Sequence, residues 1–156
     1  AVVFDGLEDL ANRIDKEDLD VNKEDILVLR YIGPKGAPGM PEAGLIPIPK
    51  KLAKQGVKDM VRISDGRMSG TASGTIILHV CPEAADGGPL ALVKSGDMIS
   101  LDVGSRSLHL HVNDDELLNR RKSLDLSKFI SNRGYKKLYM EHVLQADKGV
   151  DFDFLV

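Results

Sequence analysis

Cysteine, aromatic residues and long apolar runs are all scarce in this chain. Of its 156 residues, 4% are aromatic, none is tryptophan, and Cys81 is the single cysteine. One cysteine excludes an internal disulfide, and it cannot alone hold an iron–sulfur cluster, which needs several thiolates or similar ligands. No apolar run approaches the roughly 20 residues that cross a bilayer, and the first residues lack a charged start followed by an apolar stretch. We therefore expect a soluble, cytoplasmic protein with no membrane segment.

A strong excess of positive charge is also missing. The chain has 21 Lys and Arg against 24 Asp and Glu, a net charge of −3, and its basic residues form no long block. The charge pattern does not favour nucleic acid as a partner, and we expect none. The length suits a single domain over residues 1–156, with a core large enough to fold without disulfides or metal ions.

The chain does have a stretch rich in glycine and hydroxyl groups, residues 64–75, which we call the glycine-rich bend. It reads SDGRMSGTASGT, with glycines spaced four apart. Glycine loses much conformational freedom on folding, so it is expected where a backbone turns sharply or approaches a ligand. Backbone N–H groups aimed at one point would bind an anion. The alternative is a crowded turn whose hydroxyls only satisfy the backbone, and the spacing leaves both interpretations open.

Apolar periodicity and turn residues predict a domain that is β-rich in its middle and flanked by helices. Residues 33–49, the proline-rich loop, contain four glycines and five prolines. They are expected to form a long connection of the kind that is often functional. Asn113 is expected to cap a helix. Strands are expected at 2–4, 26–31, 60–63, 76–81, 98–103 and 108–112, a hairpin turn at 104–106, and helices at 7–14, 49–55, 114–122 and 135–146.

Three histidines and the end of the chain have structural interpretations. His142 lies on the apolar face of the last expected helix, which favours a core or interface histidine over a catalytic one. His109 and His111 share a strand face, and a solvated pair is favoured over a metal site because no third ligand has a useful spacing. Residues 151–156 are acidic and aromatic, and we expect them to dock on another surface.

Four motifs follow one another along the chain: GPKGAPGMPE at 33–42, SDGRMSG at 64–70, HVCPEA at 79–84 and GGP at 87–89. Together they resemble the C-terminal domain of the dihydroxy-acid dehydratase and 6-phosphogluconate dehydratase family, over essentially the whole chain. Gly70-Thr71 and the ending YMEHVLQAD at 139–147 are more similar to the branch that acts on sugar acids (aldonates). The resemblance implies that a larger N-terminal domain is absent from this chain.

The resemblance implies both a fold and a reaction. The fold is α+β and β-rich, a barrel-like swivelling β/β/α domain with flanking helices. The family are lyases that remove water from a sugar acid or 2,3-dihydroxy acid, giving a 2-keto-3-deoxy or 2-keto acid, in carbohydrate metabolism or branched-chain amino acid biosynthesis. A base takes the C2 proton and the C3 hydroxyl leaves. Magnesium binds the substrate carboxylate and C2 hydroxyl, and an iron–sulfur cluster binds the leaving hydroxyl, both held mainly by the N-terminal domain.

Three residues here match the family's catalytic and metal-binding positions. Ser69 matches the proposed alkoxide base, and Thr71 matches a hydroxyl that supports the site. A free serine is a poor base, so nearby metal charge and N–H donors would have to favour the alkoxide. Glu42 matches the one magnesium ligand from this domain, and a hard cation prefers such an oxygen. Without the resemblance, Glu42 would be interpreted as an ordinary exposed loop carboxylate.

Further side chains are expected to support the site. Ser64 and Gly70 belong to the same bend. Arg67 is expected either to hold a substrate carboxylate or to brace Asp65, the second being the safer assumption. Glu83 is expected to brace the end of a strand rather than to touch substrate.

The expected partners are the enzyme's own N-terminal domain, the acid substrate, and further copies in a dimer or tetramer. The isolated domain is expected to be inactive. Two alternatives stay open: a separate small subunit that docks on a cluster-bearing partner, and a stand-alone sugar-acid- or anion-binding module without catalysis.

Overall fold

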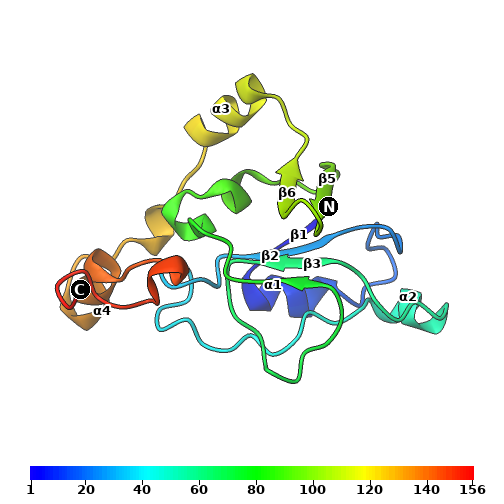
Figure 1. Ribbon diagram of the computed structural model, residues 1–156, viewed down its shortest axis with the longest axis horizontal. Helices are drawn as coiled ribbons and strands as arrows, with labels where there is room; N and C mark the ends of the chain where they lie inside the picture. The colour runs from blue at the N-terminus through cyan, green and yellow to red at the C-terminus, as the bar shows by residue number, and fades with distance from the viewer.

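The computed structural model describes residues 1–156 and has a four-stranded parallel sheet at its centre (Figure 1). The strands lie in sequence order, and parallel neighbours require a crossover connection. Helix α1 (Gly6–Arg13) is part of the first crossover, and the proline-rich loop with the short helix α2 (Lys50–Lys54) is part of the second. The strands are β1 (Val2–Asp5), β2 (Leu27–Arg30), β3 (Arg62–Ser64) and β4 (Ile76–Ile77).

The sheet buries side chains on both faces. Successive strand residues point to opposite faces. Phe4 and Leu29 therefore belong to a core that includes Leu10 of α1. Val28 and Ile63 belong to a second core on the other face, which is covered by two 3-10 helices, η1 (Ala84–Asp86) and η2 (Pro89–Leu92). A parallel sheet covered on both sides explains why its strands are apolar almost throughout.

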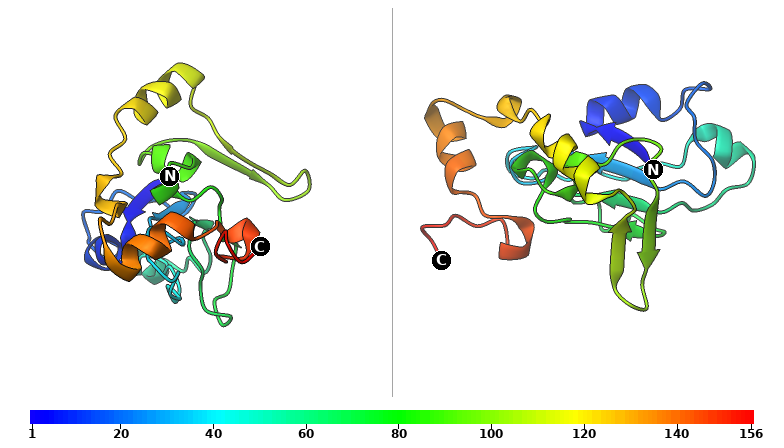
Figure 2. Two further views of the ribbon diagram at one scale, coloured as in Figure 1. Left: turned by 90° about the vertical axis from the view of Figure 1, so that its left-hand side faces the viewer. Right: turned by 90° about the horizontal axis from the view of Figure 1, so that it is seen from above.

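Two strands and a helix lie outside this sheet. Strands β5 (Ile99–Asp102) and β6 (Ser107–Leu110) form an antiparallel hairpin that projects from the body (Figure 2). Helix α3 (Asp114–Lys122) follows, and its first turn is capped as predicted, since Asn113 Oδ1 accepts from the Glu116 N–H at 2.9 Å. Arg120 Nη2 lies 3.0 Å from Asp97 Oδ1, which ties α3 to the start of the hairpin.

The last part of the chain forms a lobe at one end of the sheet (Figure 1). It consists of η3 (Ser127–Phe129), α4 (Gly134–His142), η4 (Ala146–Lys148) and the tail. The helix predicted through residue 146 ends at His142, because Val143 is extended and forms a bridge to Phe152. The core alternative for His142 is wrong, because the side chain is only half-buried and its Nδ1 lies 2.9 Å from Asp153 Oδ1. The interface alternative stays a prediction. Docking of the tail is confirmed in part: Phe152 pairs with Val143 and its ring lies 5.9 Å from that of Tyr139 in α4, whereas Leu155 and Val156 stay exposed.

Most predicted elements are confirmed to within two residues; besides the last helix, two predictions on the β structure are exceptions. The strand predicted at 76–81 is wrong beyond Ile77, since His79 has a left-handed φ of 56° that ends the extended backbone. The expected barrel-like closure is not confirmed, because β1 and β4 are opposite edges of an open sheet and the hairpin forms a separate one. The mixed α and β character holds. None of the helices has the length and apolar character needed to cross a bilayer.

Candidate active site

The two segments singled out in the sequence lie side by side. The Ala43 N–H donates to the Arg67 carbonyl at 2.9 Å, and the Ser69 N–H donates to the Gly44 carbonyl at 3.0 Å. These paired bonds join the proline-rich loop to the glycine-rich bend. Glu42 is adjacent to the first bond and Ser69 makes the second, so the structure brings the two predicted residues to one local surface.

Ser69 and Thr71 form a hydroxyl pair at the tip of the bend. Ser69 Oγ and Thr71 Oγ1 are 2.9 Å apart, and the Thr71 N–H also donates to Ser69 Oγ at 3.3 Å. Ser69 is half-buried and Thr71 is exposed. Ser69 Oγ accepts from the Thr71 N–H, and it accepts a second bond when the Thr71 hydroxyl is the donor of the pair; an oxygen with such donors is better able to carry negative charge than a free one. The tip therefore presents an oxygen to solvent with a local donor set behind it.

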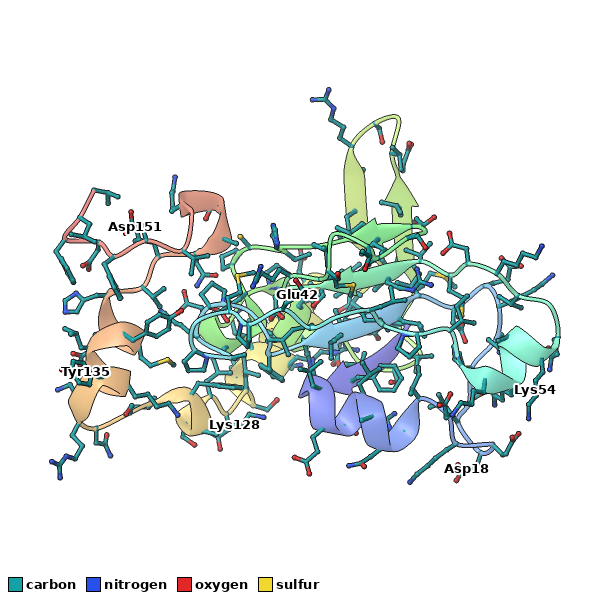
Figure 3. All side chains as sticks on the ribbon, turned by 90° about the horizontal axis from the view of Figure 1, so that it is seen from below. Asp18, Glu42, Lys54, Lys128, Tyr135 and Asp151 are labelled. Atoms are coloured by element: carbon teal, nitrogen blue, oxygen red, sulfur yellow. The ribbon has the colours of Figure 1, made fainter.

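Glu42 offers a carboxylate that nothing else in the chain uses. It is exposed, and its side chain makes no hydrogen bond or ion pair with another residue. Figure 3 shows Glu42 near the middle of the face that is seen from below. An unpaired carboxylate on a loop tied to the bend has the chemistry of a single oxygen ligand for a hard cation.

The base of the bend, in contrast, is buried. Ser64 and Asp65 are fully buried, and Ser64 Oγ accepts from the Gly66 N–H at 3.0 Å. Asp65 accepts backbone N–H bonds from Tyr31, Ile32 and Ala84, at 3.1, 3.1 and 2.9 Å. Burial raises the pKa of Asp65, and the backbone N–H donors oppose that shift. Ser64 thus shapes the bend from within and does not reach its open surface.

Arg67 and Gly70 lie nearer the tip. The expectation that Arg67 braces Asp65 is wrong, because Asp65 is buried among backbone amides while Arg67 is exposed and donates from Nε to the Met40 carbonyl at 2.9 Å. Arg67 instead forms a third link between the bend and the proline-rich loop. Gly70 is exposed, and a Cβ added there would have no heavy atom within 4 Å. Nothing inside this chain requires glycine at position 70.

The far end of the bend is held by residues that the sequence motifs did not single out. The buried Arg62 of β3 donates from Nη1 to the Ser73 carbonyl at 3.1 Å. Asp59 Oδ2 accepts from the N–H and the hydroxyl of Thr75, at 3.0 and 2.9 Å. Desolvation acts to raise the pKa of Asp59, but the Thr75 hydrogen bonds, the Met60 N–H and the charge of Arg62 together outweigh it and lower the pKa. Gly74 has a φ of 101°, and a Cβ there would lie 2.2 Å from Asp59 Oδ1.

Several backbone N–H groups of the bend are already used. Gly66, Ser69, Thr71 and Ala72 all donate within the protein, so these groups do not converge on an external anion. A cavity of about 520 Å³ lies elsewhere, beside Ala1, Asp20 and Asp97, and includes none of the candidate residues. The candidate site is therefore an open surface built from two loops.

Glu83 has a larger structural role than was expected from the sequence. It is fully buried, and its two carboxylate oxygens accept from the N–H groups of Lys35 and Gly36 at 2.7 and 2.8 Å. Its side chain thus braces the start of the proline-rich loop rather than a strand end. Burial raises the pKa of Glu83. The position of Glu83 in HVCPEA gave no sign of this distant partner.

The chain does not contain a complete metal centre. No group of three or more His, Cys, Asp or Glu side chains is arranged to hold a metal ion. Glu42 fits the role of one magnesium ligand among others from elsewhere, because its carboxylate is exposed and unpaired. Cys81 does not fit an iron–sulfur centre, since it is the single cysteine and its thiol donates to the His79 carbonyl at 3.2 Å.

Comparison with known proteins places these residues in a family. Residues 1–150 match the family model described as dihydroxy-acid/6-phosphogluconate dehydratase C-terminal. The chain is 52% identical over 162 residues to the L-arabonate dehydratase of Azospirillum brasilense, covering 100% of the chain and 28% of that protein. It is 53% identical over 155 residues to the 6-deoxy-6-sulfo-D-gluconate dehydratase of Pseudomonas putida, covering 99% and 27%.

A more distant relative is the chloroplastic dihydroxy-acid dehydratase of Arabidopsis thaliana, 36% identical over 149 residues, covering 96% of the chain and 24% of that protein. The chain thus spans only 24–28% of the length of these three relatives. The match to the C-terminal model agrees with the motif order along the chain. The chain therefore belongs to the dihydroxy-acid/6-phosphogluconate dehydratase family and corresponds to its C-terminal part.

Proposed function

We propose that this chain is the C-terminal domain of a dehydratase that converts a sugar acid to a 2-keto-3-deoxy acid. The observation that carries the proposal is the juxtaposition of the Ser69–Thr71 hydroxyl pair with the loop of Glu42 through two backbone hydrogen bonds. The two relatives near 50% identity are named as dehydratases of sugar acids, whereas the dihydroxy-acid dehydratase is 36% identical. The similarity therefore favours an aldonate over a branched dihydroxy acid.

In this proposal Ser69 is the base. Its Oγ, as the alkoxide, takes the proton from C2 of the substrate, and the C3 hydroxyl leaves; that hydroxyl and the proton taken from C2 together make up the water that is lost. The resulting enol becomes the 2-keto acid as its hydroxyl proton is replaced by a proton on C3. The proton next to a carboxylate is weakly acidic, so the base must be strong. The N–H and hydroxyl of Thr71 are placed to donate to Ser69 Oγ and so favour its deprotonated form.

Glu42 supplies one ligand to magnesium in the complete enzyme. When bound, magnesium stabilises the negative charge that develops on the substrate as the C2 proton leaves. Glu42 holds this ion near Ser69 because their loops are joined at Ala43 and Gly44. The iron–sulfur cluster of the family has no ligand set in this chain, so no step is assigned to it here.

The N-terminal domain would then cover the face that carries Glu42, Ser69 and Gly70. Open space around Gly70 supports this, since the bend leaves room there for a substrate or a neighbouring domain. The isolated chain is expected to be inactive because it offers one metal ligand. A dimer or tetramer of the full enzyme remains part of the proposal, and the exposed tail residues Leu155 and Val156 are available for such contacts.

The test uses the full-length enzyme and a panel of aldonates and branched dihydroxy acids, assayed for 2-keto-acid formation. Ser69→Ala should lower turnover of the best substrate by about 10²- to 10⁴-fold, the range for loss of a positioned base. Ser73→Ala, which removes an exposed hydroxyl from the same bend, should leave turnover near the wild-type value. Equal turnover in Ser69→Ala and wild type would reject the base and favour the alternative of a chain that only binds sugar acids.

A further inference from the structure

We infer that Gln145 is a positioning residue for Glu42: it holds Glu83, and Glu83 fixes the start of the proline-rich loop that presents the Glu42 carboxylate. The inference rests on the proposed function of Glu42 as a metal ligand and adds to it a segment more than a hundred positions away in the sequence. We call residues 139–145 the C-terminal brace.

Gln145 and Glu83 make a reciprocal pair. The Gln145 side-chain amide donates from Nε2 to Glu83 Oε1 at 2.9 Å, and its Oε1 accepts from the Glu83 N–H at 2.7 Å. The pair orients both the backbone and the side chain of Glu83. Since Glu83 is fully buried, its carboxylate has no water to replace a lost partner.

The oriented carboxylate then holds the loop. Its oxygens accept from the N–H groups of Lys35 and Gly36. The fit is close, because a Cβ added to Gly33 would lie 2.7 Å from Glu83 Oε2. The brace reaches the same turn a second time, where Tyr139 Oη donates to the Pro34 carbonyl at 3.0 Å.

A continuous set of contacts leads from this turn to Glu42. The Ala37 N–H donates to the Gly33 carbonyl at 2.9 Å, and the Met40 N–H donates to the Ala37 carbonyl at 2.7 Å. Met40 is buried, and its carbonyl accepts from Arg67 Nε. Glu42 lies two residues beyond Met40, so its backbone position depends on both the brace and the bend. Outer partners that orient a metal ligand commonly contribute to metal affinity.

The experiment compares Gln145→Glu with Gln55→Glu in the full-length enzyme. The first change keeps the size of the side chain but places a carboxylate against that of Glu83, which removes the donor and adds repulsion. The second makes the same change at an exposed glutamine after α2 and is the matched control. Two quantities are measured: the magnesium concentration for half-maximal activity, and the rate of amide hydrogen exchange in residues 33–42.

In Gln145→Glu we expect faster exchange in residues 33–42 and about a tenfold higher half-saturating magnesium concentration. Turnover at saturating magnesium should stay near the wild-type value, since the reacting groups are unchanged. Tyr139→Phe, a milder change, should move both quantities in the same direction by less. Gln55→Glu should move neither.

An unchanged rate of amide hydrogen exchange in residues 33–42 of Gln145→Glu would overturn the inference that the C-terminal brace holds the proline-rich loop. Faster exchange with an unchanged magnesium requirement would overturn the positioning role and leave Gln145 a purely structural residue. Glu42→Gln distinguishes a failure of the proposed function: if that variant keeps the wild-type magnesium requirement, Glu42 is not a ligand, while the exchange rates still report whether the brace holds the loop.

Discussion

The two ends of one short bend differ sharply in how their polar groups are used. At its base, residues 64–66, the hydroxyl and carboxylate are fully buried and bonded to backbone N–H groups. At its tip, residues 69–71, the hydroxyls of the half-buried Ser69 and the exposed Thr71 bond to each other. The polar groups of the base are therefore used to hold the backbone, whereas the hydroxyls of the tip remain able to contact an outside molecule. The contrast indicates that the exposed groups at the tip are held in place by a buried polar anchor, Ser64 and Asp65, a few residues away.

Replacing the buried Asp65 should have the largest effect on the free energy of unfolding. Asp65→Asn keeps the shape but puts an amide nitrogen where backbone N–H donors need an acceptor. We expect a loss of about 2–3 kcal/mol in the free energy of unfolding, measured by urea denaturation. Asp86→Asn, an exposed acidic residue in η1, is a control expected to change stability less. Equal losses in the two variants would mean that the burial of Asp65 does not set its contribution to stability.

One substitution made at two glycines of the bend gives the next largest contrast. Gly74→Ala would force a left-handed alanine against Asp59 and should lower the free energy of unfolding by about 1–3 kcal/mol. Gly70→Ala meets open space in this chain and should change that free energy by less than about 0.5 kcal/mol. In the full-length enzyme, Gly70→Ala should nevertheless raise KM if substrate approaches there. Similar stability losses at both positions would contradict the structure of the tip.

Loss of the Thr71 hydroxyl should lower the turnover rate and have little effect on the free energy of unfolding. Thr71→Val removes one hydrogen bond to Ser69 Oγ, and we expect turnover of the full-length enzyme to fall about tenfold, corresponding to roughly 1.4 kcal/mol. Thr71→Ser keeps a hydroxyl and should recover most of the rate. Turnover that falls equally in both variants would indicate that the methyl group of Thr71, rather than its hydroxyl, supports the tip.

The smallest expected effect is a pH dependence of the free energy of unfolding that comes from Asp65, at the buried end of the bend. Burial raises the pKa of Asp65 in the folded protein above the ordinary value of 3.8. An acid with a raised folded-state pKa binds its proton more tightly when folded, so acidification through that range favours the folded state. The stability difference between wild type and Asp65→Asn should therefore widen as the pH falls from neutral toward 3.8. A difference that narrows would mean that the backbone N–H donors dominate over burial.

Local features of the chain could be predicted from its sequence alone. The Asn113 cap, the hairpin turn at 104–106 and the loop at 33–49 depend on residues a few positions apart, whose preferences act at short range. The motif order was likewise enough to identify the family, since it needs no knowledge of contacts. The choice of Ser69, Thr71 and Glu42 came from that resemblance, and their roles await the experiments above.

Long-range packing accounts for what the residues did not reveal. Arg67 bonds to Met40 across 27 positions, and Gln145 bonds to Glu83 across 62. Asp65 was expected to pair with Arg67 and Glu83 to brace a strand end, yet the fold buries both carboxylates and surrounds them with backbone N–H groups. A buried carboxylate must find donors wherever the folded backbone provides them, because water is excluded. The donors that a buried carboxylate finds in this way follow no periodic pattern in the sequence. They can therefore be identified only from the folded structure.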